Sequence, residues 1–141
     1  MQITQKCKSV VLVFNLILLF ITVTDCSSQQ SGSVNDSAIV QLTSQSASEL
    51  VDDITVTILD VRTIEEYKAS HIKGAIVIPL QALEKRVSEI EHLKDKKVLV
   101  YCRTGNRSKK ALSILQQNGF GRLLHLEKGI KLWVEEGFKV E

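Results

Sequence analysis

Hydrophobic residues in this chain are spaced in two ways from about residue 38 onward. Short runs rich in Val, Ile and Leu alternate with segments whose apolar residues recur at helical spacing. The runs are typical of buried strands and the spaced segments of amphipathic helices. Strands are predicted at 39–42, 55–61, 75–78, 98–101 and 123–126, and helices at 47–52, 63–69, 80–93, 108–118 and 130–136. This alternation predicts an α/β fold, a five-stranded parallel sheet with helices on both faces.

The first 37 residues have a different pattern. Lys6 and Lys8 precede an apolar run from Val10 to Val23, which Asn15 interrupts. The run is shorter than the roughly 20 residues of a spanning helix, so 1–26 is predicted to be a signal peptide or lipoprotein signal. An uncleaved anchor helix is the alternative. Residues 27–37, rich in Ser and Gln, predict a flexible tether, which leaves 38–141 as the folded domain. We therefore expect a periplasmic or otherwise extracytoplasmic protein.

Cys26 follows the apolar run directly and precedes the tether. This position is similar to that of the lipid-carrying cysteine of bacterial lipoproteins, although Asp25 stands where such signals have a small residue. Lipidation of Cys26 and ordinary cleavage near residues 24–28 both remain open. A single acyl chain binds membrane only marginally. Membrane contact is expected only through the N-terminal segment or a lipid on Cys26.

A cysteine lies where the predicted strand 98–101 ends. Cys102 is followed by a polar loop and then by Ser108, the predicted N-cap of the next helix. Parallel sheets bind ligands at the carboxyl ends of their strands. Loop amides and a helix N-terminus can hold an anion there. With Arg103 and Arg107 beside it, the thiol is expected to have a lowered pKa and to act as a nucleophile. The alternative is an inert buried cysteine, which two neighbouring arginines do not favour.

Charged residues also end the predicted strand 55–61. Asp60 and Arg62 should lie at the same edge of a parallel sheet as Cys102. One interpretation is an internal salt bridge that fixes the loop. The other is that Arg62 adds positive potential near the pocket.

Composition and residue counts exclude several other functions. A formal net charge of +2 and 5% aromatic residues argue against nucleic-acid binding. The three histidines have no paired spacing, so no metal site is expected. Cys102 has no nearby cysteine, which argues against a thiol–disulfide oxidoreductase.

Three segments, taken together, resemble the rhodanese (sulfurtransferase) family. They are Asp60–Tyr67 with His71–Ala75 and Ile78–Leu80, the loop Cys102–Ser108, and Leu126–Ile130 with Trp133. The resemblance runs in one order from about Ala38 to the C-terminus. It implies a central five-stranded sheet with the catalytic loop between the fourth strand and its helix. In one departure, Lys128-Gly129 stands where the family usually has two glycines.

The resemblance also implies a reaction and its site. Cys102 would take a sulfur atom from thiosulfate or a similar anionic donor, and the persulfide would pass it to a thiophilic acceptor, cyanide or a cellular thiol. No cofactor is implied. The predicted substrate-binding residues are those of the loop, with Asp60 and Arg62 in support: Arg103, Thr104, Gly105, Asn106, Arg107 and Ser108.

Two other functions remain open. A phosphatase or arsenate reductase of related fold would carry Cys-x5-Arg, whereas this chain has the shorter spacing Cys102-x4-Arg107. That spacing favours sulfur over phosphorus. A rhodanese-like module that binds a partner or carries sulfur without turnover is the non-enzymatic alternative, and the presence of Cys102 leaves a sulfur-carrier role open.

Overall fold

The computed structural model describes residues 39–141. The predicted signal, the tether and Cys26 lie outside the described residues. Among residues 39–141, no helix is long and apolar enough to cross a membrane.

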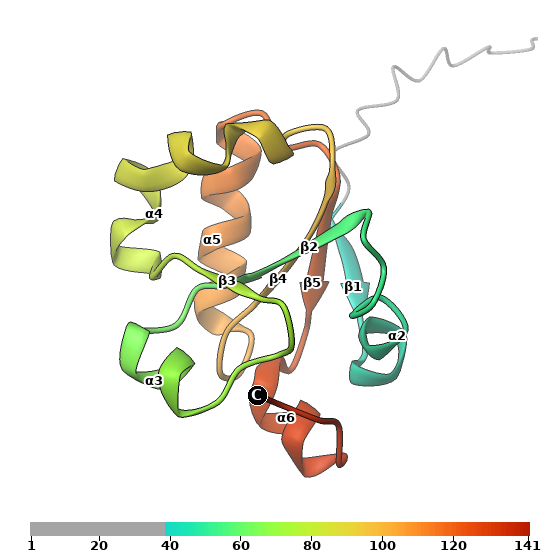
Figure 1. Ribbon diagram of the computed structural model, residues 1–141. Helices are drawn as coiled ribbons and strands as arrows, with labels where there is room; N and C mark the ends of the chain where they lie inside the picture. Colours follow the sequence, from blue (N-terminus) through green and yellow to red (C-terminus); the bar gives the residue numbers. More distant parts are fainter. Residues whose placement is uncertain (1–38) are drawn as a thin grey trace, which may run out of the picture. The chain divides into compact units, whose positions relative to one another are not determined.

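A parallel sheet forms the centre of the domain (Figure 1). Its strands lie in the order β1-β5-β4-β2-β3, and every neighbouring pair is parallel. The predicted α/β fold and five-stranded parallel sheet are confirmed. The strands are β1 (Val40–Leu42), β2 (Val56–Asp60), β3 (Ile76–Val77), β4 (Lys97–Tyr101) and β5 (Leu123–Leu126). The helices are α2 (Ser44–Ser48), α3 (Ile64–Ala69), α4 (Leu80–Arg86), the 3-10 helix η1 (Val87–Leu93), α5 (Asn106–Gln117) and α6 (Gly129–Glu135).

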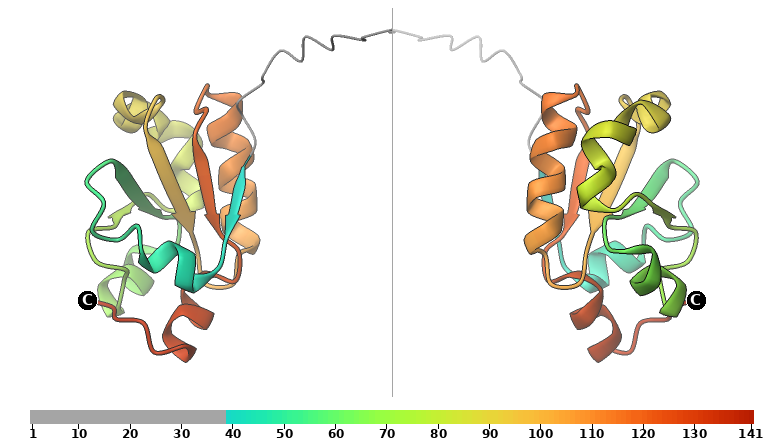
Figure 2. Two further views of the ribbon diagram at one scale, coloured as in Figure 1. Left: turned by 90° about the vertical axis from the view of Figure 1, so that its right-hand side faces the viewer. Right: turned by 90° about the vertical axis from the view of Figure 1, so that its left-hand side faces the viewer.

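Helices lie on both faces of the sheet (Figure 2), and one apolar cluster packs against each face. Successive residues of a strand point to opposite faces. Val98 and Val100 of β4 therefore pack in the cluster that includes α4 and α5, while Leu99 and Tyr101 pack in the cluster that includes α2 and α6. All four side chains are fully buried. Strand β4 is thus the central strand, covered on both faces, and it ends at Tyr101, directly before Cys102.

Several helix boundaries differ from the sequence-based prediction. The first helix is α2, which begins at Ser44 rather than Ala47, because the Thr43 side chain accepts a hydrogen bond from the Ser46 amide and caps it. The predicted helix 80–93 is divided: α4 ends at Arg86, and η1 follows with Ile90 outside helical geometry. The tighter second part keeps Ile90 and Leu93 in the core.

The predicted N-cap of α5 is wrong. The helix begins at Asn106, and its cap is Gly105 with φ 93°, a left-handed conformation that glycine adopts without cost. Ser108 instead lies buried in the first turn, where its hydroxyl contacts Gly105 O and His125 Nε2. A glycine at positive φ turns the chain into the helix earlier than a serine cap would.

Candidate active site

The Cys102 sulfur lies at the carboxyl end of β4, in the turn that leads into α5. It is almost fully buried, with 1% of the residue exposed. The Gly105 amide donates a hydrogen bond to Sγ at 3.2 Å, and the Ser108 hydroxyl lies 3.5 Å from it. The loop therefore turns donors inward onto one sulfur atom.

Helix α6 explains why amides rather than carbonyls face the sulfur. The Ile130 amide donates to the Cys102 carbonyl at 2.9 Å, and the Lys131 amide donates to the Arg103 carbonyl at 3.0 Å. Both donors belong to the first turn of α6, whose amides have no partner within the helix. The loop carbonyls are thereby held toward α6, which leaves the loop amides free to point inward.

Two glycines allow this close packing. Gly105 has φ 93°, and a Cβ there would collide with the Glu127 carbonyl. Gly129 has φ 65°, and a Cβ there would collide with the backbone of Cys102 and Arg103. Lys128, the departure from the family pattern, has φ −96° and ψ 0°, a turn conformation with negative φ that does not require glycine. Its exposed ammonium lies 3.6 Å from Glu127. The turn therefore needs only the second of the two glycines.

Burial and hydrogen bonding act in opposite directions on the Cys102 thiol. Burial raises its pKa, because a thiolate is poorly solvated there. Donors from the Ser108 hydroxyl and from the amides of Ser108, Thr104 and Gly105 lower it, and together they outweigh burial, so the pKa of Cys102 is lowered. The direction is the expected one, although these donors, rather than the two arginines, are the main cause. The site is suited to a thiolate nucleophile and to the negative charge of an anion.

The two arginines of the loop have different surroundings. Arg107 forms a two-pronged ion pair with Glu66 of α3, at 2.6 and 2.8 Å. This guanidinium lowers the pKa of the Glu66 carboxyl to about 2. Arg107 thus links the start of α5 to α3. Arg103 is exposed, as are Thr104 and Asn106.

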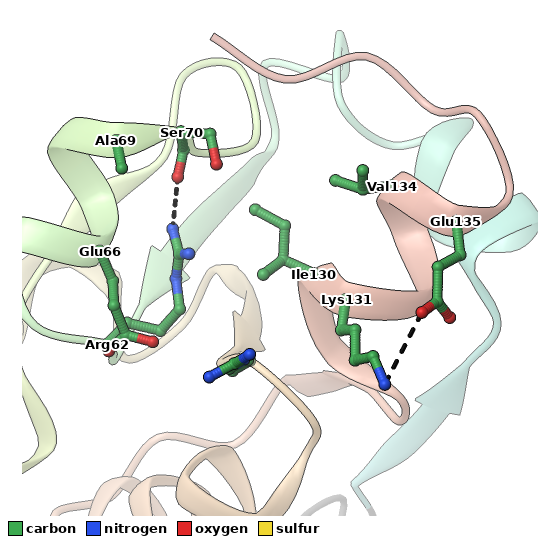
Figure 3. A pocket seen from close by; sticks show the side chains of 9 residues that line it. Arg62, Glu66, Ala69, Ser70, Ile130, Lys131, Val134 and Glu135 are labelled. Atoms are coloured by element: carbon green, nitrogen blue, oxygen red, sulfur yellow. Dashed lines mark hydrogen bonds and ion pairs between the residues drawn. The ribbon is translucent and has the colours of Figure 1, made fainter.

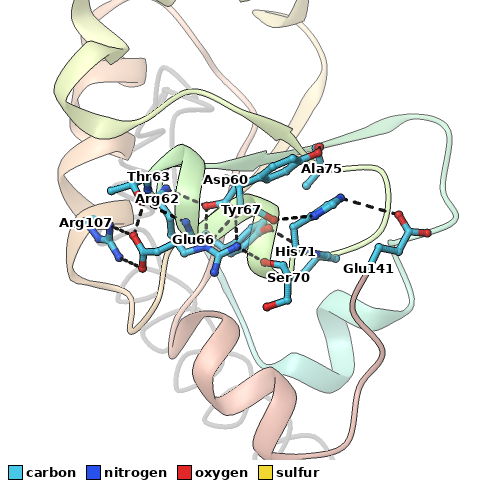
Figure 4. A network of polar contacts seen from close by, with 12 residues as sticks. Asp60, Arg62, Thr63, Glu66, Tyr67, Ser70, His71, Ala75, Arg107 and Glu141 are labelled. Atoms are coloured by element: carbon cyan, nitrogen blue, oxygen red, sulfur yellow. Dashed lines mark hydrogen bonds and ion pairs between the residues drawn. The ribbon is translucent and has the colours of Figure 1, made fainter.

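Asp60 and Arg62 form a buried pair at the end of β2 (Figure 4). Arg62 Nε donates to both Asp60 oxygens, and Nη2 donates to Asp60 Oδ2 at 2.6 Å and to the Ser70 carbonyl at 2.7 Å. Figure 4 also shows His71 between Tyr67 and Glu141. The Asp60–Arg62 pair fixes the loop before α3, while the Arg62 side chain also lines the neighbouring cavity.

A cavity of about 410 Å³ lies between α3 and α6 (Figure 3). Ile130 and the half-exposed Val134 supply apolar surface, and charged side chains surround them. No sequence motif indicated a role for the α6 side of this cavity. The spacing of Ile130 and Val134, four residues apart, was the available signal. The lining residues are Arg62, Glu66, Ala69, Ser70, Arg103, Ile130, Lys131, Val134 and Glu135.

Two further polar residues behind the sulfur were missed as site residues. His125 of β5 is fully buried, and its ring contacts Ser108 Oγ at 2.8 Å and Gln41 Oε1 at 2.7 Å. The period of two along β5 could have placed His125 on the same face as Leu123, beneath α5. Gln41 gave no signal, because its contact depends on β1 pairing with β5. Among residues 39–141, no three His, Cys, Asp or Glu side chains are placed to hold a metal ion.

Residues 43–136 match the family model described as the Rhodanese-like domain. A sulfurtransferase of Allochromatium vinosum is 38% identical over 101 residues, which cover 71% of this chain and 92% of that protein. YrkF of Bacillus subtilis, a putative sulfur carrier protein, is 33% identical over 105 residues, which cover 74% of this chain and 56% of that protein. This chain therefore spans little more than half of YrkF.

The fold is also similar to that of solved structures. The crystal structure of a rhodanese-related protein from Thermoplasma volcanium superposes with a TM-score of 0.64 at 33% identity, covering 72% of this chain and 97% of that one. The BH2092 protein from Bacillus halodurans superposes with a TM-score of 0.65 at 29% identity. The superposition covers 72% of this chain and 76% of that one.

Proposed function

This chain belongs to the rhodanese-like domain family, and we propose that it is a thiosulfate sulfurtransferase that works through a persulfide on Cys102. One observation carries the proposal. Hydrogen-bond donors from the loop and from α5 converge on a buried sulfur whose pKa they lower. The same donors can hold the negative charge that a persulfide carries.

The reaction has two displacement steps. The Cys102 thiolate attacks the outer sulfur of thiosulfate, the new S–S bond forms, and sulfite leaves with the electron pair of the old one. The acceptor, cyanide or a cellular thiol, then attacks the terminal sulfur of the persulfide and restores the thiolate. Such covalent catalysis gives ping-pong kinetics. The exposed Arg103 supplies positive charge near the loop, Arg107 is paired with Glu66, and the step needs no cofactor.

Intact-mass analysis tests the covalent step. The protein is incubated with and without thiosulfate, and one added sulfur atom on Cys102 is expected. Cys102→Ser is the matched control, because it keeps the side-chain size and removes the nucleophile. A Cys102→Ser protein that still releases thiocyanate from thiosulfate and cyanide would contradict the proposal.

A turnover measurement separates an enzyme from a carrier. Repeated thiocyanate release per protein molecule is expected of a sulfurtransferase. Loading of one sulfur atom without repeated release would show a carrier instead. Hydrolysis of a phosphate ester, or reduction of arsenate, without sulfur loading would support the related phosphatase or arsenate reductase.

We also propose that the domain acts outside the cytoplasm, on the basis of Lys6, Lys8 and the apolar run that follows them. Cell fractionation and sequencing of the mature N-terminus test this. A full-length cytosolic protein would contradict export, and labelled fatty acid on Cys26 would distinguish a tethered from a free form.

A further inference from the structure

A chain of polar side chains leads away from the Cys102 sulfur through the interior. Ser108 Oγ lies 3.5 Å from Sγ and 2.8 Å from His125 Nε2, and His125 Nδ1 lies 2.7 Å from Gln41 Oε1. Ser108 and His125 are fully buried, whereas Gln41 is exposed on the edge strand β1. The four residues come from the loop, α5, β5 and β1, so the fold assembles them.

The hydrogen-bond donors and acceptors fix where the protons lie. Gln41 Oε1 can only accept, so His125 Nδ1 carries the ring proton, and in the neutral ring Nε2 is an acceptor. The single hydroxyl proton of Ser108 has three acceptors within reach: Nε2 at 2.8 Å, the Gly105 carbonyl at 2.9 Å and Cys102 Sγ at 3.5 Å. Nε2 is the nearest of them. When that proton points to Nε2, Ser108 Oγ can accept a hydrogen bond from a Cys102 thiol, and when it points to Sγ, Ser108 donates to the sulfur.

We propose that Ser108 and His125 form a proton relay that takes the Cys102 thiol proton to His125 Nε2. The S–H bond breaks as a new O–H bond forms on Ser108, while the old O–H proton moves to Nε2. A neutral thiol and a neutral imidazole become a thiolate and an imidazolium, with no other atom gained or lost. The Ser108 hydroxyl then donates to the thiolate. His125 reaches the sulfur only through Ser108, so it is a positioning residue.

The surroundings of His125 keep its ring neutral, so that Nε2 has a free lone pair. Burial lowers its pKa, because the imidazolium is poorly solvated, and the charge of Lys109 on α5 lowers it further. The Gly105 backbone and Glu127 oppose these effects without reversing them. On β1 the ring faces the uncharged Gln41. His125 is therefore neutral near neutral pH, and the relay stops working when the pH falls far enough to protonate the ring.

The relay rests on Cys102 being the nucleophile of the proposed function, and alkylation by iodoacetamide tests it without any sulfur donor. The alkylation rate and the thiolate fraction, measured by ultraviolet absorbance, are followed against pH. Below the thiol pKa, the native protein is expected to react at least about tenfold faster than its thiolate fraction allows, as general-base assistance would give. In His125→Gln the rate should follow the thiolate fraction. A native rate that tracks the thiolate fraction, or an excess that survives in His125→Gln, would overturn the relay.

Gln41→Glu provides a second test on an exposed residue, in case the buried His125 variant fails to fold. A carboxylate on the Nδ1 proton stabilises the imidazolium, so the relay predicts faster alkylation below the thiol pKa. Added negative charge acting on the thiolate alone would slow it. Gln45→Glu, on the exposed surface of α2, adds the same charge as the control. A rate in Gln41→Glu that is unchanged or lower than in Gln45→Glu would overturn the relay. Loss of sulfur loading with the expected alkylation profile would contradict the proposed function alone.

Discussion

Glu66 determines where the guanidinium of Arg107 points. Because Arg107 lowers the Glu66 pKa from 4.5 to about 2, the pair stabilises the fold at pH values above 4.5. Glu66→Gln is expected to lower the free energy of unfolding by about 1–2 kcal/mol at neutral pH, after allowance for the partial exposure of the pair. The difference from the native protein should shrink as the pH falls toward 2. Denaturant unfolding at both pH values measures it.

Glu89→Gln is the matched control for this prediction. Glu89 also pairs with an arginine, Arg86 at 2.8 Å, but both side chains are more exposed. A smaller stability change is expected there. Equal losses of stability in the two variants, or a loss in Glu66→Gln that persists at low pH, would show that the Glu66–Arg107 ion pair does not stabilise the fold as proposed.

Substitution of Gly105 tests how closely the Cys102 loop packs against the turn that follows β5. Gly105→Ala would place a Cβ against the Glu127 carbonyl at a positive φ, so the loop must shift and the amide contact to Sγ is lost. We expect the free energy of unfolding to fall by about 3 kcal/mol or more, and Cys102 to be alkylated more slowly. Gly119→Ala is the control, because Gly119 also has positive φ but a Cβ there meets open space. Gly119→Ala should lower the free energy of unfolding, measured in urea, by about 1 kcal/mol and leave the alkylation rate of Cys102 unchanged. Equal effects would rule out the packing argument.

Single-residue chemistry was partly readable from the sequence. The position of Cys102 at a strand end and the donors of its loop follow from local order. The partner of Arg107 did not, because Glu66 is 41 residues away, and neither did His125, which is 17 residues from Ser108. Such pairs depend on which strands become neighbours.

The junction between β4 and α5 sets the geometry of the loop. Inserting one glycine between Asn106 and Arg107 would rotate the rest of α5 by about 100° relative to the loop. Ser108 would leave the sulfur and Arg107 would leave Glu66, so we expect loss of most thiosulfate:cyanide activity. The longer loop has the Cys-x5-Arg spacing, and phosphate or arsenate should protect Cys102 from alkylation better than in the native protein.

An insertion at the other end of α5 is the control for this loop prediction. One glycine placed after Asn118 leaves the Cys102 contacts in place, so sulfur transfer should be retained. If the variant with the longer loop keeps full sulfur transfer and gains no oxyanion protection, loop length does not select the substrate.

Strands were predicted more accurately than helix ends. The strands were visible as runs of buried residues, and β4 in particular as Val98–Tyr101. The start of α5 was placed too late because a glycine cap has no side-chain signature, whereas Ser108 looked like a cap. Apolar spacing also continued across Arg86, so the change from α4 to η1 could not be read from it.

The segment 138–141 contacts both α6 and the residue His71 that follows α3. The backbones of Glu141 and His71 exchange two hydrogen bonds of 2.8 Å. Trp133 Nε1 donates to the Lys139 carbonyl, and the Trp133 ring lies 4.8 Å from that of Phe138. Removing residues 138–141 is expected to lower the free energy of unfolding by about 2–3 kcal/mol and to change the fluorescence of Trp133. Lys139→Ala, which keeps the carbonyl, should have little effect. The midpoint of denaturant unfolding measures the effect, and an unchanged midpoint in the truncated protein would show that the segment does not stabilise the domain.

The strand order of the whole sheet was beyond local reasoning. Alternating strands and helices implied a parallel sheet, but not that β1 would lie beside β5. That pairing brings Gln41 to His125. The part of the site assembled by topology was therefore the part that could not be foreseen.

Strand β1 runs in the same direction as β4, so Val40 lies at the end of the sheet opposite to Cys102. A bead, sensor chip or fusion partner joined ahead of Val40 would hold the domain at that opposite end, and the end of the sheet that carries the Cys102 loop would face the solution. Glu141 is at the other end, paired with His71 next to the cavity residue Ser70. A graft at that end would crowd the cavity. For immobilisation the two ends are not equivalent, and the amino end is the one to use.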